Sequence, residues 1–126
     1  MKKILLIEDD EIMSRMYKKL FSYKGYSIET AGDGQEGLAK AQKTKPDIIL
    51  LDVMMPKLNG LQVLDRLKKD PKTRDIQVVL LSNLSIQDEL DKALDKGIIK
   101  YIIKRNHEPD EIFKIVEEII ASKDKT

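Results

Sequence analysis

The chain has 126 residues, with 23 basic and 22 acidic side chains and no cysteine. This length suits one domain, and the 41% hydrophobic share is that of a globular protein rather than a disordered one. The lack of cysteine excludes disulfides and thiolate metal sites, and the net charge of +1 gives no overall attraction to nucleic acids or anionic membranes. Apolar runs reach about five residues, far fewer than the roughly 20 of a membrane-spanning helix. We therefore expect a soluble cytoplasmic protein with no membrane segment and no direct nucleic-acid binding.

Short apolar runs alternate along the chain with segments whose apolar residues recur at helical spacing. The runs predict strands at residues 4–7, 27–30, 48–51, 78–81 and 101–103, of which the second has the weakest pattern. The helical spacing predicts helices near residues 12–21, 34–44, 61–67, 86–94 and 112–120. The second of these helices is the weakest, because each internal glycine costs about 1 kcal/mol relative to alanine.

Residues typical of helix ends lie at the expected boundaries. Gly25 and Gly97 follow the first and fourth helices, where a residue with left-handed backbone angles commonly ends a helix. Ser85 and Asp88 form a capping-box pattern at the start of the fourth helix. Pro109 suits the first turn of the fifth helix. These boundaries separate each predicted strand from the next by one helix.

The alternation of strands and helices predicts an α/β protein with a doubly wound (βα)5 fold. Continuous apolar runs suit parallel strands that are buried on both faces, with helices on either side of the sheet. We expect one domain over residues 1–121, followed by a short polar tail at residues 122–126. This tail is either a natural end or the start of a linker.

Charged and hydroxyl side chains follow four of the predicted strands, at the edge where open α/β sheets bind ligands. Acids from Glu8 to Glu11 follow the first strand, and Asp52, Ser82 and Lys104 follow the third, fourth and fifth. Taken singly, the acids could oppose a helix dipole and the others could be ordinary surface residues. Together, acids from adjacent strand ends repel one another unless a cation relieves them. An oxygen-only set without histidine or cysteine suits Mg²⁺ before Zn²⁺.

These residues belong to a longer pattern, made up of residues 4–10, 47–60, 80–82 and 101–104. The pattern resembles the receiver domain of two-component response regulators, over about residues 2–121, in its stand-alone single-domain form. The resemblance implies a flavodoxin-like parallel sheet with strand order 2-1-3-4-5.

The resemblance also implies a phosphoryl acceptor and a metal site. Asp52 takes the place of the carboxylate nucleophile that accepts the phosphoryl group. Glu8, Asp9 and Asp52 take the places of the Mg²⁺-binding acids, with Asp9 a direct ligand and Glu8 acting through water. The backbone carbonyl of Met54 completes the implied metal site. Mg²⁺ is thus the one cofactor that we expect.

Three further residues have implied roles in responding to phosphorylation. Ser82 would bond a phosphoryl oxygen, Lys104 would pair with the phosphate, and Tyr101 would be the switch aromatic. The implied protein is a phosphorelay signalling module, supplied by a sensor histidine kinase or a phosphotransfer protein. It would turn over only its own phosphoryl group and is therefore not an enzyme in the usual sense. Its fourth helix, fifth strand and fifth helix would form an output face for an unknown partner, and a phosphorylation-dependent homodimer stays open.

The chain departs from the family pattern at several positions. Arg105 stands where the family usually has proline after its lysine, and Asn83 stands where it usually has a small residue. The last helix carries Glu117 and Glu118 in place of the basic residues of the DNA-binding class. His107 is expected to be a surface loop residue, because one histidine cannot build a metal site.

Two alternative functions belong to other classes. The first is a receiver-like interaction module that binds partners without phosphorylation, which the residues at 83 and 105 keep open. The second is a true enzyme on the same fold. A dehalogenase-type phosphatase would need a second aspartate where Met54 stands, and a flavodoxin would need a glycine- or hydroxyl-rich phosphate loop after the first strand.

Overall fold

The computed structural model describes residues 2–55, 57–82, 91–92, 95 and 97–124. Its strands are β1 (Lys3–Ile7), β2 (Ser27–Ala31), β3 (Ile48–Leu51), β4 (Gln77–Ser82) and β5 (Lys100–Ile103). Its helices are α1 (Glu11–Tyr23), α2 (Gly34–Thr44), α3 (Gly60–Lys69) and α5 (Pro109–Asp124), with a 3-10 turn η1 (Lys104–Asn106) directly after β5. The predicted fourth helix, with its Ser85–Asp88 capping box, lies largely outside the described residues.

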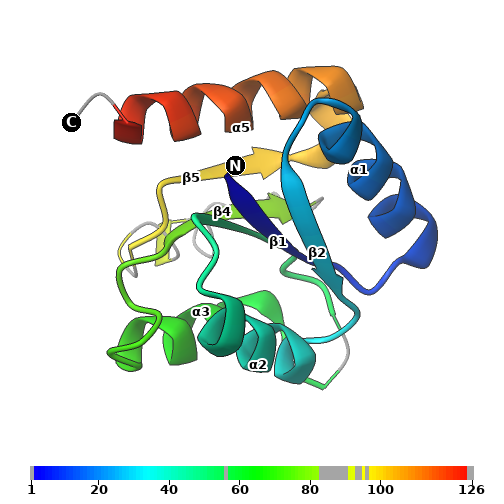
Figure 1. Ribbon diagram of the computed structural model, residues 1–126. Helices are drawn as coiled ribbons and strands as arrows, with labels where there is room; N and C mark the ends of the chain where they lie inside the picture. The colour runs from blue at the N-terminus through cyan, green and yellow to red at the C-terminus, as the bar shows by residue number, and fades with distance from the viewer. Residues whose placement is uncertain (1, 56, 83–90, 93–94, 96, 125–126) are drawn as a thin grey trace.

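The strands form one parallel sheet in the order β2-β1-β3-β4-β5. This confirms the predicted fold class and strand order. Parallel strands need a crossover connection, and α1, α2 and α3 supply it between the first four strands. Figure 1 shows α1 and α5 on one face of the sheet and α2 and α3 on the other.

Side chains of β1 and β3 alternate between two hydrophobic cores. On the α2–α3 face the core includes Leu5 and Ile7 of β1 and Ile49 and Leu51 of β3. On the α1–α5 face the neighbouring residues of both strands take part in the second core, together with Tyr17, Phe21 and Phe113. Every residue of β3 is fully buried, which explains why its sequence is continuously apolar rather than alternating.

Helix ends follow the residues predicted from the sequence. Gly25, directly after the C-cap residue of α1, has a φ of 96°, a backbone conformation that favours glycine. Gly97 has the same φ, and the helix that it was predicted to end lies largely outside the described residues. Pro109 is the first residue of α5. Asn59 caps α3 through a reciprocal pair of hydrogen bonds with Gln62, so the Asn-Gly step opens a helix rather than a hairpin.

The two glycines of α2 have a packing role that the sequence pattern did not reveal. A Cβ at Gly37 would lie 2.5 Å from Cδ1 of Ile7, and a Cβ at Gly34 would lie 2.6 Å from Cγ2 of Val63. Their lack of a side chain brings α2 close to β1 and α3. The helix is further held by Lys40, whose Nζ donates to the carbonyl of Thr30 at 2.6 Å.

Gly60 allows α3 to begin against the backbone that follows β3. A Cβ at this position would lie 2.3 Å from the carbonyl oxygen of Asp52 and 2.6 Å from Cα of Val53. The Gly60 N–H donates to the Val53 carbonyl at 2.8 Å. A backbone atom cannot move aside as a side chain can, so only glycine fits. The start of α3 therefore fixes the backbone of Asp52.

The last helix extends beyond the predicted domain boundary. α5 continues to Asp124 and so includes part of the segment 122–126 that we assigned to a polar tail. After Pro109 in its first turn, the helix contains no glycine or proline that would interrupt it. Within the part of the chain that the structure describes, no helix is long and apolar enough to span a membrane.

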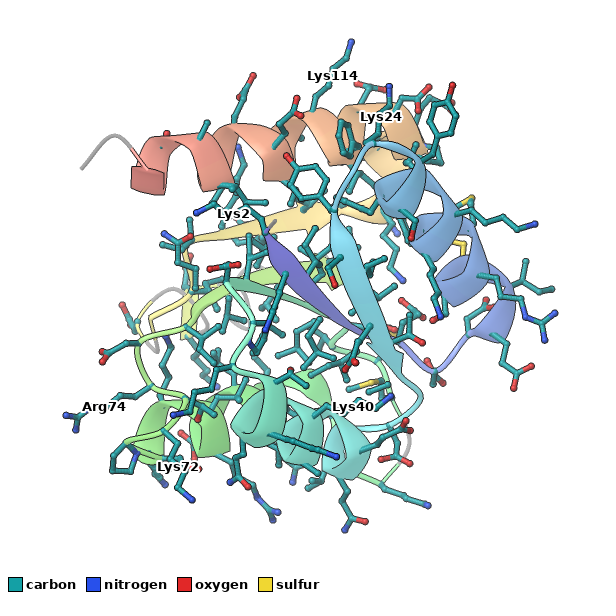
Figure 2. All side chains as sticks on the ribbon, in the orientation of Figure 1. Lys2, Lys24, Lys40, Lys72, Arg74 and Lys114 are labelled. Atoms are coloured by element: carbon teal, nitrogen blue, oxygen red, sulfur yellow. The ribbon has the colours of Figure 1, made fainter. Side chains whose placement is uncertain are left out.

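Basic side chains are spread over several elements. Figure 2 labels Lys24 and Lys114 near α1 and α5, and Lys72 and Arg74 at the opposite side of the molecule, after α3. Lys24 lies over the ring of Phe113, with its Nζ 5.6 Å from the ring centroid. These two pairs of labelled cations thus lie on opposite sides of the molecule.

Candidate functional site

The site is built at the carboxyl edge of the sheet, where neighbouring strands end. Glu8 and Asp9 directly follow β1, Asp52 directly follows β3, and Lys104 begins the turn after β5. The backbone N–H of Asp52 donates to the carbonyl of Ile7 at 3.0 Å, which extends the pairing of β1 and β3 into the site. Residues far apart in the sequence therefore meet because parallel strands end at the same edge.

Three carboxylates form the acidic part of the site. Oxygens of Glu8, Asp9 and Asp52 lie within 4.8 Å of one another. Glu8 is only 3% exposed and Asp52 only 5% exposed, whereas Asp9 is exposed. The cluster thus has a buried base and one solvent-facing acid.

Lys104 supplies a positive charge inside this cluster. Its Nζ donates to Oε2 of Glu8 at 2.7 Å and lies 3.8 Å from Oδ2 of Asp52. The side chains of Lys104 and Glu8 are 10% and 2% exposed, so water screens this pair only slightly. The lysine therefore offsets part of the repulsion between two buried carboxylates.

The surroundings of Glu8 shift its pKa. Removal from water raises the pKa of Glu8 above its usual value; the hydrogen bond from Lys104 opposes this rise and the nearby charge of Asp52 adds to it. On the other side of Glu8, burial raises the pKa of Tyr17 to about 12, and the charge of Glu8 contributes. Tyr17 is a residue that sequence reasoning placed only in the core, because its helical spacing carries no sign of the carboxylate beside it.

Asp10, which follows the acidic pair, has a structural role in this structure. Its Oδ1 accepts hydrogen bonds from the backbone N–H groups of Ile12 and Met13, at 2.9 and 3.2 Å, and so caps α1. The backbone N–H of Asp10 itself donates to Oε1 of Glu8 at 3.3 Å. The positive end of α1 therefore points toward the carboxylates. Of the acids after β1, Asp10 therefore caps a helix, whereas Glu8 and Asp9 belong to the carboxylate cluster.

Met54 contacts the site through its backbone. Its N–H donates to Oδ1 of Asp52 at 3.3 Å, while its side chain is 63% exposed. Asp52 therefore has one oxygen near a backbone donor and the other near Lys104. That the backbone carbonyl of Met54 binds the metal remains an expectation.

The remaining predicted residues lie along β4 and β5. The backbone of Ser82 ends β4 and pairs with Ile103, and its side chain lies outside the described part of the chain, as does Asn83. Tyr101 is half-buried and packs against the core on the α2–α3 face. Arg105 lies in the 3-10 turn, so the chain turns after β5 without proline.

His107 lies between this turn and α5. Its side chain is 33% exposed, and Nδ1 lies 3.7 Å from Oε2 of Glu111. This agrees with the expectation of a loop residue outside the cluster.

The acidic cluster fits a hard divalent cation. All three acids offer carboxylate oxygens, the ligands that Mg²⁺ prefers, and the repulsion between them is relieved only in part by one lysine. The exposed position of Asp9 leaves the site open to solvent. This suits Mg²⁺, which usually keeps several bound waters.

With this geometry established, comparison with known proteins identifies the family. Residues 4–117 match the response regulator receiver domain family, so the chain belongs to that family. Receiver domains are signalling phosphoacceptors rather than true enzymes, and they accept phosphoryl groups from histidine kinases. Acidic clusters of this kind are typical of their Mg²⁺ sites.

Curated relatives are longer than this chain. The DNA-binding dual master transcriptional regulator RpaA of Synechocystis is 39% identical over 105 residues, which is 82% of this chain and 43% of that protein. The response regulator PleD of Caulobacter vibrioides is 39% identical over 102 residues, which is 81% of this chain and 22% of that protein. The chain thus spans less than half the length of these two relatives.

Solved structures show the same fold over nearly the whole chain. The receiver domain of a Francisella response regulator has 28% identity and a TM-score of 0.87, with 98% of this chain and 99% of that chain covered. A complex of CheX and CheY with BeF3 and Mg²⁺ from Borrelia burgdorferi has 25% identity and a TM-score of 0.84, with 94% and 88% covered.

The buried ion pair gives a stability prediction. Lys104→Met leaves Glu8 as a buried charge without its partner, so we expect unfolding in metal-free buffer to become easier by about 3 kcal/mol. The double variant Glu8→Gln/Lys104→Met should recover most of this loss. Urea denaturation followed by circular dichroism measures both effects.

A matched surface pair supplies the control. Lys69 lies 3.1 Å from Asp65, but their side chains are 77% and 43% exposed. Lys69→Met should therefore change the free energy of unfolding by less than about 0.5 kcal/mol. If both lysine variants lose the same small amount of unfolding free energy, the buried pair of Lys104 and Glu8 does not contribute to stability as its burial implies.

Proposed function

We propose that this chain is a phosphorelay receiver whose Asp52 accepts a phosphoryl group from a phosphohistidine of a sensor kinase or phosphotransfer protein. The observation that carries the proposal is the position of Asp52, a buried carboxylate at the carboxyl edge of the sheet with a lysine and two further acids around it. Such an arrangement suits phosphoryl transfer, which depends on charge neutralisation and positioning more than on covalent help.

The transfer forms one bond and breaks one. An oxygen of the Asp52 carboxylate attacks phosphorus, the P–O bond forms, and the P–N bond to the donor histidine breaks. The electron pair of that bond returns to the imidazole. The Met54 N–H at 3.3 Å from Oδ1 helps to orient the carboxylate for this attack. The ammonium of Lys104, already 3.8 Å from Oδ2, can pair with the charge that the phosphoryl group brings.

Glu8, Asp9, Asp52 and the carbonyl of Met54 are the residues that would hold Mg²⁺. When bound, this ion neutralises charge on the phosphoryl oxygens. The chain's own contribution is to keep these donors together: β1 and β3 hold the acids in register, and the cap of α1 on Asp10 fixes the backbone beside them.

Phosphorylation would then switch the face formed by the fourth helix, β5 and α5. An acyl phosphate adds charge and strong acceptor oxygens where one carboxylate stood. This draws Lys104 away from Glu8, and Ser82 is the hydroxyl proposed to follow. Tyr101, half-buried above the core, is the side chain proposed to change its position as β5 adjusts. Two states that differ by a few kcal/mol suffice for such a response.

Phosphorylation on Asp52 can be tested directly. After incubation with acetyl phosphate and Mg²⁺, intact mass should show one added phosphate, and Asp52→Asn should abolish it. Asp10→Asn is the matched control, because an asparagine oxygen can still cap α1. Undiminished labelling of Asp52→Asn would reject the assignment, and a complete lack of labelling in the unsubstituted chain would favour the interaction module that works without phosphorylation.

Metal binding has a separate readout in thermal stability. At about five times its dissociation constant, Mg²⁺ should stabilise the fold by roughly 1 kcal/mol, or about 4 °C in melting temperature. Asp9→Asn should lose most of this shift, whereas Glu11→Gln, an exposed acid in the first turn of α1, should keep it. Circular dichroism melting serves as the measurement. Equal shifts in both variants would mean that the metal lies elsewhere.

The switch can be followed with beryllofluoride as a phosphoryl mimic. Amide NMR should show changes that extend from residue 52 along β5 to α5, including Tyr101. Asp52→Asn, treated in the same way, should show none of them. Changes confined to the ends of β1 and β3 would count against a switch in the β5–α5 face.

A further inference from the structure

A cavity lies at the edge of the sheet opposite the acidic cluster. The amino ends of β4 and β5 and the later turns of α5 line an open cavity of about 460 Å³, a volume within the range of ligand pockets. Figure 1 shows α5 running along β5 toward this end. The lining includes Gln77 of β4, Ile99 and Lys100 at the start of β5, and Ile115, Glu118 and Ile119 of α5.

The apolar part of this cavity is open to solvent. Ile99 is 48% exposed, and Ile115 and Ile119 are half-buried and packed against the core on the α1–α5 face. Three isoleucines, one just before β5 and two on α5, thus give this cavity an apolar wall. Covering such a wall with a branched aliphatic side chain removes apolar surface from water on both partners.

Beside the apolar wall, Gln77 has a hydrogen-bond acceptor without a donor in the described part of the chain. Its Oε1 is buried and has no hydrogen-bond partner among the described residues. A buried acceptor without a donor is costly, so rotation of this side chain toward a donor in the cavity would be favourable. The cavity therefore suits a ligand that carries an N–H group next to an apolar group.

Opposite charges lie on the two walls. Lys100 is exposed on β5 and Glu118 is exposed on α5. Within the described chain, neither of them forms an ion pair. A ligand that carries both an acidic and a basic group could pair with both of these charged residues. A purely apolar ligand could pair with neither.

β5 is the outermost strand at this side of the described sheet. An edge strand offers backbone groups to an incoming extended chain, which gains hydrogen bonds there. An extended peptide combines the required features: backbone N–H groups, an aliphatic side chain and flanking charges.

We propose that this cavity docks an extended segment of a partner protein in which a branched aliphatic residue is flanked by an acidic and a basic residue. The aliphatic side chain lies on Ile99, Ile115 and Ile119, a backbone N–H donates to Oε1 of Gln77, and the flanking charges face Lys100 and Glu118. The cavity belongs to the β5–α5 part of the output face, so its signalling role rests on the proposed function, although docking itself does not need phosphate.

The test uses the acetylated, amidated tripeptide Glu-Leu-Lys and the unphosphorylated full chain. Amide NMR titration should show millimolar binding, with shifts at Gln77, Ile99 and the later turns of α5. The peptide Glu-Ala-Lys should bind roughly tenfold more weakly, because it lacks the buried aliphatic group. The peptide Gln-Leu-Gln should also bind more weakly, and its binding should depend less on salt.

Variants of the chain locate the contact. Ile99→Ala and Gln77→Leu should each weaken binding severalfold, and Ile12→Ala, which alters another exposed isoleucine on α1, should not. Gln77→Leu removes the unpaired acceptor, so its melting temperature should not fall and lost binding cannot be ascribed to unfolding.

Several results would overturn the proposal. One is binding that Ile99→Ala leaves unchanged; another is a set of shifts centred on α1. A third is movement of the same amides when the chain alone is concentrated, since a second copy would then cover the cavity. The Asp52→Asn variant should bind the peptide as well as the unsubstituted chain, so failure of phosphorylation and failure of docking are distinguishable.

Discussion

Two buried carboxylates that are both ionised repel each other strongly unless a positive charge lies with them, and this constraint governs the arrangement of the carboxyl edge. Glu8 and Asp52 are nearly inaccessible to water, so their repulsion acts at low dielectric. Lys104, 96 residues from Glu8 in the sequence, offsets part of this repulsion. The sheet order follows the same requirement, because β1 and β3 must be neighbours for the acids to meet and β5 must end at the same edge for the lysine to reach them.

Parallel strand order and close packing together give the site its rigidity. β3 is buried on both faces, so its last residue leads directly into the cluster without a flexible approach. Gly60 then brings the start of α3 against the Asp52 backbone, and the backbone N–H of Asp10, the cap residue of α1, donates to the Glu8 carboxylate. The acids are thus held by elements that have other reasons to be in place, namely burial of the two hydrophobic cores.

Most of this architecture was predictable from the sequence. The apolar runs placed the strands, and the residues after them placed the carboxylates and Lys104 at one edge, because parallel strands leave no other arrangement. Contacts that depend on local closeness were not predictable. The glycines of α2 looked only unfavourable in the sequence, since nothing local shows that Ile7 lies against Gly37. Tyr17 matched an apolar helical face, and the carboxylate beside it became visible only in three dimensions.

The separation of Glu8 and Lys104 in the sequence, 96 residues, also makes the site depend on the synthesis of β5 and the turn after it. During synthesis the amino-terminal strands emerge first, and the acids of β1 and β3 can approach before β5 exists. Such a chain has a cluster of carboxylates without its lysine, and its sheet lacks the final strand. A receiver of this design acquires its charge balance only when β5 has joined the sheet, so a chain cut before Lys104 is electrostatically unlike the whole domain.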